Sequence, residues 1–134
     1  MFTGIVEARG LVLKKDILSS GLVLHVEVPE GFNKDLKKGA SISVNGVCLT
    51  ATEYTENRIS FDVIKETLRS TNLEDLNETS EVNIERSLKF GDEVGGHILS
   101  GHVCCACKAK LNKTGNEIEI SVEKPKKWGE YIFP

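Results

Sequence analysis

The chain has 134 residues, of which 40% are hydrophobic and 28% charged. This length and composition can bury the core of one ordinary globular domain and are too apolar for a disordered protein. The formal net charge of -3 gives no positive field for phosphates, which argues against nucleic acid as a partner. No apolar run approaches the roughly 18 residues of a membrane span, and no basic and apolar leader opens the sequence, so we expect a cytoplasmic protein.

Short apolar stretches bounded by turn residues indicate that strands dominate the chain. The expected strands are residues 22–28, 41–44, 47–51, 58–64 and 80–85. Asn45-Gly46 is the clearest turn, because this dipeptide tolerates the positive φ of a tight hairpin. One helical turn is expected at 66–69 and a weak helix at 33–36. Strands of this length and spacing predict a closed or nearly closed antiparallel barrel.

An internal repeat gives the domain organisation. The matched residues are Gly4 and Val6 with Gly101 and Val103, at an offset of 97, and Val26, Glu27 and Pro29 with Val122, Glu123 and Pro125, at an offset of 96. The second copy stops before a counterpart of residues 41–50. We therefore expect a first barrel over residues 1–96, with the boundary in the turn-rich stretch 90–96, and the opening strands of an incomplete second barrel over 97–134.

Three side chains could carry chemistry, and each has a structural alternative. Cys48 follows the tight hairpin, where a strand end can direct a side chain to the mouth of a cavity, but a small buried residue is the common role of a strand cysteine. His97 and His102 lie on either side of 98–101, and either could transfer a proton near neutral pH or serve as a structural histidine. We interpret His25 as structural.

The other cysteines form the run Cys104-Cys105-Ala106-Cys107. We expect thiols rather than disulfides, because no secretory leader precedes them. The spacing lacks the second ligand pair of a zinc site, so we expect no metal here. Strand alternation would direct Cys105 and Cys107 to one face and Cys104 to the other.

Residues 62–67 leave a strand for a short turn and offer main-chain groups, a carboxylate and a hydroxyl. Such a set suits a polyhydroxylated or amide-bearing ligand. The alternative is that Asp62 or Thr67 caps the following helical turn. The sequence spacing assembles no Ser-His-Asp constellation, phosphate-binding loop or dinucleotide motif.

Five segments in order resemble the riboflavin synthase family of lumazine-binding barrels. They are residues 1–7 (MFTGIVE), 44–50 (VNGVCLT), 61–68 (FDVIKETL), 82–86 (VNIER) and 95–103 (GGHILSGHV). The resemblance implies an all-β fold with two six-stranded antiparallel Greek-key barrels, the second incomplete here. It also implies the family's reaction, in which two molecules of 6,7-dimethyl-8-ribityllumazine give riboflavin and 5-amino-6-ribitylaminouracil. The family needs no cofactor or metal.

The resemblance also implies the site. Cys48 and His102 become the catalytic candidates, for addition at C7 of the lumazine and for proton transfer. The residues implied to bind the substrate are Phe2, Gly4, Ile5, Val6, Ser41, Cys48, Leu49, Thr50, Asp62, Val63, Ile64, Lys65, Glu66, Thr67, His97, Gly101, His102 and Val103.

In the family, the first barrel of one subunit and the second barrel of another form each site. The resemblance therefore implies a homo-oligomer, a trimer for the complete family enzyme and a dimer for this shorter chain, with turnover impaired here. A non-catalytic lumazine- or riboflavin-binding module is the alternative. A generic oligonucleotide-binding barrel is a third reading, which the acidic balance and the 6% aromatic content disfavour.

Overall fold

The computed structural model describes residues 1–132, and its contacts divide the chain into two compact units, Met1–Val103 and Cys104–Pro134. The first unit extends beyond the 90–96 stretch in which the sequence placed the boundary. Segment 97–103 returns to the N-terminal residues: the amide of His97 donates to the carbonyl of Thr3 at 3.0 Å. Phe2 and Leu99 form a bridge of antiparallel type.

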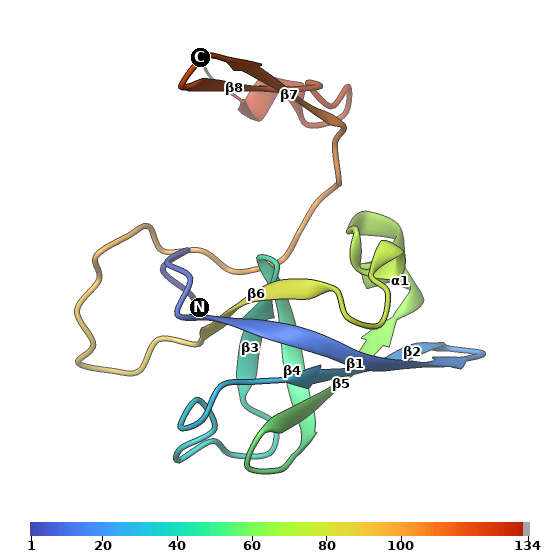
Figure 1. Cartoon of the computed structure of the whole chain (residues 1–134), viewed down its shortest axis with the longest axis vertical. Coiled ribbons are helices and arrows are strands. Elements are labelled where there is room, and N and C mark those ends of the chain that lie inside the picture. Colours follow the sequence, from blue (N-terminus) through green and yellow to red (C-terminus); the bar gives the residue numbers. More distant parts are fainter. Residues whose placement is uncertain (133–134) are drawn as a thin grey trace. The chain divides into compact units, whose positions relative to one another are not determined.

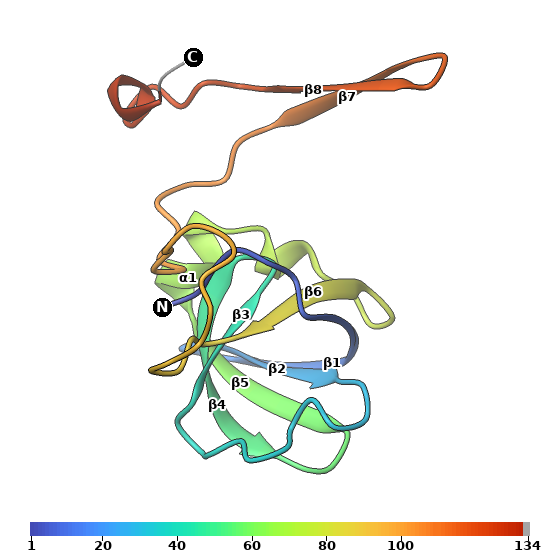
Figure 2. The ribbon, with the colours of Figure 1, turned by 90° about the vertical axis from the view of Figure 1, so that its left-hand side faces the viewer.

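Six strands close into a barrel in the first unit (Figures 1 and 2). They are β1 (Ala8–Leu18), β2 (Gly21–Glu27), β3 (Ser41–Val44), β4 (Val47–Tyr54), β5 (Arg58–Ile64) and β6 (Glu81–Arg86). The order around the barrel is β1-β2-β5-β4-β3-β6, and every pairing is antiparallel. The expected all-β, six-stranded antiparallel barrel is confirmed.

Strand β1 is the element that the sequence analysis missed. Its register against β2 shifts between Val12 and Lys14. This bulge interrupts the alternation of inward and outward side chains, so the period-two pattern that marks a strand is lost at its centre. The other five strands lie within three residues of their expected ends.

The Asn45-Gly46 turn is confirmed. Both residues have positive φ, 50° and 82°, and they join β3 to β4 with Val44 opposite Val47. Asn45 also ties this turn to β6, because its amide donates to the carbonyl of Asn83 and its side-chain oxygen accepts from the Asn83 amide, both at 2.8 Å. The turn therefore fixes the register of β3 between two neighbours.

The two helical expectations differ in outcome. Helix α1 (Lys65–Ser70) confirms the turn expected at 66–69. The weak helix expected at 33–36 is wrong: these residues form hydrogen-bonded turns, and Asp35 has a φ of 57°. A residue in the left-handed region does not have right-handed helical geometry, so a helix cannot continue through it.

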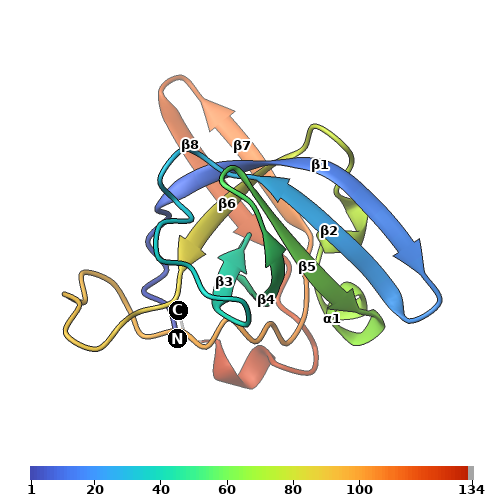
Figure 3. The same ribbon diagram turned by 90° about the horizontal axis from the view of Figure 1, so that it is seen from below.

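Inward-facing residues of all six strands fill the barrel. Leu24, Val26, Ile42, Val44, Ala51 and Ile59 are fully buried. Helix α1 and the 3-10 turn Leu73–Asp75 follow β5 and add buried leucines to the same core. The amide of Lys65 donates to the carbonyl of Ser20, which holds the start of α1 beside the β1–β2 turn (Figure 3).

The second unit contains one antiparallel hairpin, β7 (Ala109–Thr114) and β8 (Glu117–Val122), followed by the short turn Gly129–Tyr131. This hairpin fits the opening strands of an incomplete second barrel, because β8 ends at Val122, the repeat partner of Val26 near the end of β2. Every residue of β7 and β8 is exposed. Across residues 1–132, no helix has the length and apolar character needed to cross a membrane.

Candidate functional site

The N-terminal segment and segment 99–103 form a matched pair of turns in the first unit. Phe2 and Leu99 exchange backbone hydrogen bonds of 2.8 and 2.9 Å. Beyond this bridge, the amide of Ile5 donates to the Thr3 hydroxyl, and the amide of His102 donates to the Ser100 hydroxyl, each at 3.1 Å. The offset of 97 found in the sequence thus recurs as one repeated backbone turn.

A glycine stands at the same place in each turn. Gly4 has a φ of 78° and Gly101 a φ of 75°, a region that other residues adopt only with strain. A Cβ on Gly4 would lie 2.9 Å from the Leu99 side chain, and one on Gly101 would lie 2.8 Å from the Cβ of Cys48. Both positions therefore require glycine for conformation and for space.

The turn at Gly101 docks on the start of β4. The amide of Cys48 donates to the carbonyl of Gly101 at 2.8 Å. Cys48 is half-buried and His102, the next residue after Gly101, is exposed. This hydrogen bond places Gly101, the residue before His102, beside Cys48, although the two catalytic candidates are 54 residues apart in the sequence.

Cys48 lies opposite Ser43 on the neighbouring strand β3. Ser41 on β3 lies opposite Thr50 on β4, and Thr50 is exposed. Val103 packs against the barrel core. Because β4 and β5 run antiparallel, the start of β4 and the end of β5 lie at the same end of the barrel. Residues 48–50, 62–67 and 101–103 can therefore contribute to one surface.

Residues 62–67 continue from β5 into α1. Asp62, Ile64, Lys65 and Glu66 are exposed. The N-cap of α1 is Ile64 and makes no side-chain capping bond, so neither Asp62 nor Thr67 has the capping role considered as the alternative. These polar groups are available to a ligand.

Three of the residues implied to bind substrate are part of the interior. Phe2, Leu49 and Val63 are 2–4% exposed. Their side chains pack inside the barrel unit, so a ligand at the surface could reach only their backbone groups. Ile5 and Val6, by contrast, are about half exposed.

Glu85 was not found by sequence reasoning. It lies on β6 with only 6% of its surface exposed. Its carboxylate accepts hydrogen bonds from the amide and hydroxyl of Thr3, at 2.6 and 2.8 Å, and from the amide of Gly4 at 3.2 Å. The alternation of β6 would direct Glu85 to solvent. In the structure, the N-terminal segment covers its side chain.

His97 lies apart from a regular strand. Its backbone is held by Thr3, and its side chain is exposed. A regular strand would place His97 and His102 on opposite sides, whereas this segment contains only the bridge at Leu99. The structure places His97 beside the N-terminal turn, and His102 follows Gly101 in the turn that docks on β4.

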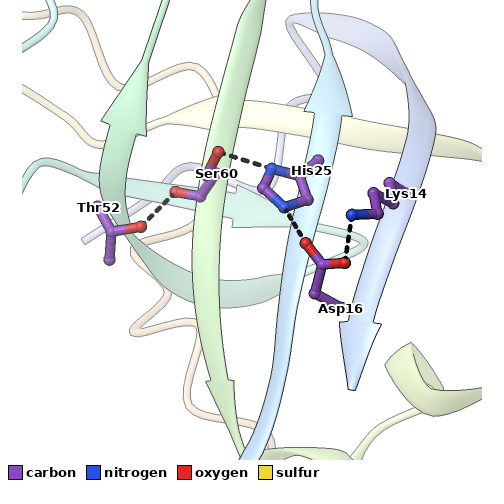
Figure 4. A network of polar contacts seen from close by, with 5 residues as sticks. All are labelled: Lys14, Asp16, His25, Thr52 and Ser60. Carbon is purple, nitrogen blue, oxygen red and sulfur yellow. Dashed lines mark hydrogen bonds and ion pairs between the residues drawn. The ribbon is translucent and has the colours of Figure 1, made fainter. Parts of the chain in front are cut away.

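An Asp-His-Ser series occurs on the outer face of the barrel, although the sequence spacing did not suggest one (Figure 4). His25 Nε2 contacts Asp16 Oδ2 at 3.1 Å, and its Nδ1 contacts Ser60 Oγ at 2.8 Å. Hydrogen bonds from Lys14, the larger cause, and from His25 lower the pKa of Asp16. Ser60 is 2% exposed. A substrate cannot reach this hydroxyl, so the series joins three strands and leaves His25 structural.

Among residues 1–132, no cluster of three or more His, Cys, Asp or Glu side chains could hold a metal ion. The closed six-stranded sheet defines an antiparallel β-barrel protein. A family described as "Lumazine binding domain" matches residues 3–87. The chain belongs to the lumazine-binding domain family.

Similar proteins extend this result. The chain is 44% identical over 121 residues to a protein named riboflavin synthase from Escherichia coli (strain K12), covering 90% of this chain and 57% of that protein. It is 45% identical over 133 residues to riboflavin synthase of Chlamydia pneumoniae, covering 99% of this chain and 65% of that protein. The chain thus spans less than two thirds of the length of these relatives.

Solved structures share the fold. A crystal structure of LumP complexed with riboflavin has a TM-score of 0.86 and 23% identity, covering 98% of this chain and 72% of that one. LumP complexed with 6,7-dimethyl-8-(1'-D-ribityl) lumazine has a TM-score of 0.83 and 22% identity, covering 98% and 71%. At these identities, the likeness establishes the barrel architecture.

Proposed function

We propose that this chain binds 6,7-dimethyl-8-ribityllumazine and takes part in the riboflavin synthase reaction. The observation that carries the proposal is the hydrogen bond from the Cys48 amide to the Gly101 carbonyl, which places the residue before His102 beside Cys48. The names of the relatives and the ligands held by LumP supply the substrate class.

The chemistry needs two oriented rings and a path for protons. The C7 methyl group of the lumazine is acidic, because its carbanion delocalises into the ring. Two such molecules exchange a four-carbon unit, giving riboflavin and 5-amino-6-ribitylaminouracil. Holding both rings in the reacting orientation lowers the activation barrier. A side chain whose pKa lies near neutral pH transfers the protons. We assign addition at C7 and proton transfer to Cys48 and His102.

We assign ligand contacts to three groups of residues. Segment 101–103 and residues 48–50 would hold the ring, and exposed polar groups of 62–67 would hold the ring edge and the ribityl chain. Ser41 and Thr50, opposite each other on β3 and β4, would shape the neighbouring surface. Gly4, Ile5 and Val6 lie on the turn that repeats 101–103, so we assign them the equivalent ring contact, with Phe2 and His97 supporting it.

A second copy of the chain would supply the other half of a site. The reaction needs two substrate molecules, and a turn equivalent to the one at Gly101 occurs at Gly4 within the same unit. We propose a homodimer whose turnover is lower than that of the longer relatives. Four free cysteines fit the reducing cytoplasm, where we place the protein.

A fluorescence titration of 6,7-dimethyl-8-ribityllumazine with the protein tests this function, followed over hours for riboflavin emission. Saturable quenching with slow formation of riboflavin is the expected result. Saturable quenching without any riboflavin would instead identify a binding module. A spectrum unchanged by folded protein, with folding checked by circular dichroism, would refute the proposed ligand.

A further inference from the structure

The second unit begins with three thiols that the proposed lumazine chemistry does not use. Cys104 and Cys107 are exposed and Cys105 is half-buried. The sulfur atoms of Cys105 and Cys107 lie 3.9 Å apart. The sequence alternation predicted this shared side for Cys105 and Cys107, but Cys104, which it directed to the other face, lines the same cavity.

The local backbone explains this contact. Residues 104–108 lead into β7, and the amide of Glu123 donates to the carbonyl of Lys108 at 2.9 Å, which continues the hairpin by one further bond. Residues two apart in extended chain share a side. A disulfide has an S–S length of about 2.04 Å, so closure has to bring the sulfurs closer by roughly 1.9 Å and bend the chain between Cys105 and Cys107.

The two thiols line an open cavity of about 780 Å³. Val122, Pro125 and Trp128 supply apolar walls, and Glu123 and Lys124 supply one charge of each sign. A small disulfide compound therefore has space at the sulfurs. Desolvation and the hydrogen bond with Cys105 raise the pKa of the Cys107 thiol, which favours Cys105 as the attacking sulfur.

We propose that Cys105 and Cys107 form a redox-sensitive dithiol that closes to an intramolecular disulfide by exchange with a small-molecule disulfide of the glutathione type. In the first step, the Cys105 thiolate attacks the disulfide, forms a mixed disulfide and releases one thiolate of the reagent. In the second, Cys107 loses its proton to solvent and attacks the Cys105 sulfur, releasing the second thiolate. The protein loses two electrons, and one reagent disulfide becomes two thiols.

The position of Cys107 makes the second step intramolecular. Its sulfur already touches that of Cys105, so closure competes with release of the mixed disulfide at a high effective concentration. The mixed disulfide should therefore not accumulate in the native chain. If Cys107 is replaced by Ser, the same intermediate has no adjacent thiol and should persist.

The full chain, equilibrated with mixtures of reduced and oxidised glutathione, tests this proposal. Samples are quenched in acid, alkylated and analysed by intact mass and peptide mapping. The expected native product has lost two hydrogen atoms, with the bond mapped between Cys105 and Cys107. Cys104→Ser, the matched control from the same run of cysteines, should form the Cys105–Cys107 disulfide equally well. Cys107→Ser should retain one glutathione on Cys105.

Three results would overturn the dithiol. They are a native chain that retains glutathione on Cys105 without closing, a disulfide that links two chains, and a Cys104→Ser variant that no longer closes. Because the readout is covalent mass, it is independent of lumazine binding. Both substituted positions lie outside the barrel core, so circular dichroism of each variant should match the parent.

Discussion

Glu85 on β6 holds Thr3 in place, because its carboxylate accepts hydrogen bonds of 2.6 Å from the Thr3 amide and 2.8 Å from the Thr3 hydroxyl. A third bond reaches the amide of Gly4. One buried carboxylate on β6 thus satisfies the donors of the turn that presents Ile5 and Val6. This relationship makes Glu85 a positioning residue for the N-terminal half of the candidate site.

Replacing Glu85 by Gln keeps the shape and removes the charge. One oxygen still accepts both bonds from Thr3, but the new amide group takes the place of Oε2 and faces the N–H of Gly4. Since hydrogen bonds to charged groups contribute about 1.5–3 kcal/mol, we expect a loss of that order in free energy of unfolding and weaker lumazine binding. Urea unfolding and the fluorescence titration measure the two effects. An unchanged affinity at lower stability would give Glu85 a purely structural role.

Gly101→Ala tests the docking of its turn on Cys48. The left-handed φ costs a non-glycine residue roughly 1–2 kcal/mol, and the new Cβ would also collide with Cys48. We expect the variant to fold and to lose most of its lumazine affinity.

Gly39→Ala is the control for that variant. Gly39 has a φ of 88° and open space around it, so alanine there brings the same backbone strain without the collision. Its affinity should match the parent protein. Equal losses of affinity in the two variants would show that strain alone explains the result and that the contact with Cys48 is unimportant.

Cys48→Ser separates a catalyst from a carrier. Serine keeps the size and the backbone hydrogen bond but is a poorer nucleophile than a thiol. We expect lumazine binding to persist within a few-fold and riboflavin formation to fall by at least tenfold. Cys104→Ser, outside the candidate site, is the matched control and should change neither. Unaltered turnover in Cys48→Ser would exclude a thiol role.

Stability should fall in acid because of Asp16. Its pKa is lowered in the folded state from the ordinary value of 3.8 by hydrogen bonds from Lys14 and His25. A lowered folded pKa means that the stabilisation is complete above 3.8 and is lost as the pH falls through the folded value. In Asp16→Asn, the free energy of unfolding should therefore decline less steeply as the pH falls from 5 to 2. Parallel curves for the two proteins would contradict this assignment.

Local signals in the sequence predicted much of the barrel, because most strands are short and keep their alternation between turn residues. Asn45-Gly46 shows how far two residues can specify a hairpin. Strand β1 escaped prediction because a bulge breaks its period. The pairing of Cys48 with Gly101 and the role of Glu85 could not be read from spacing, since both depend on a chain segment that returns from far away in the sequence.

The exchange of backbone bonds between Phe2 and Leu99 also sets where the barrel can be cut. A protease that cleaves in the turn-rich stretch 90–96 would detach the partner of Phe2 and leave the acceptor for the Cys48 amide on the other fragment. Cleavage after Val103 would keep both. The smallest autonomous fragment of this protein should accordingly run to Val103, with the first residues of the second repeat serving as the closing segment of the first.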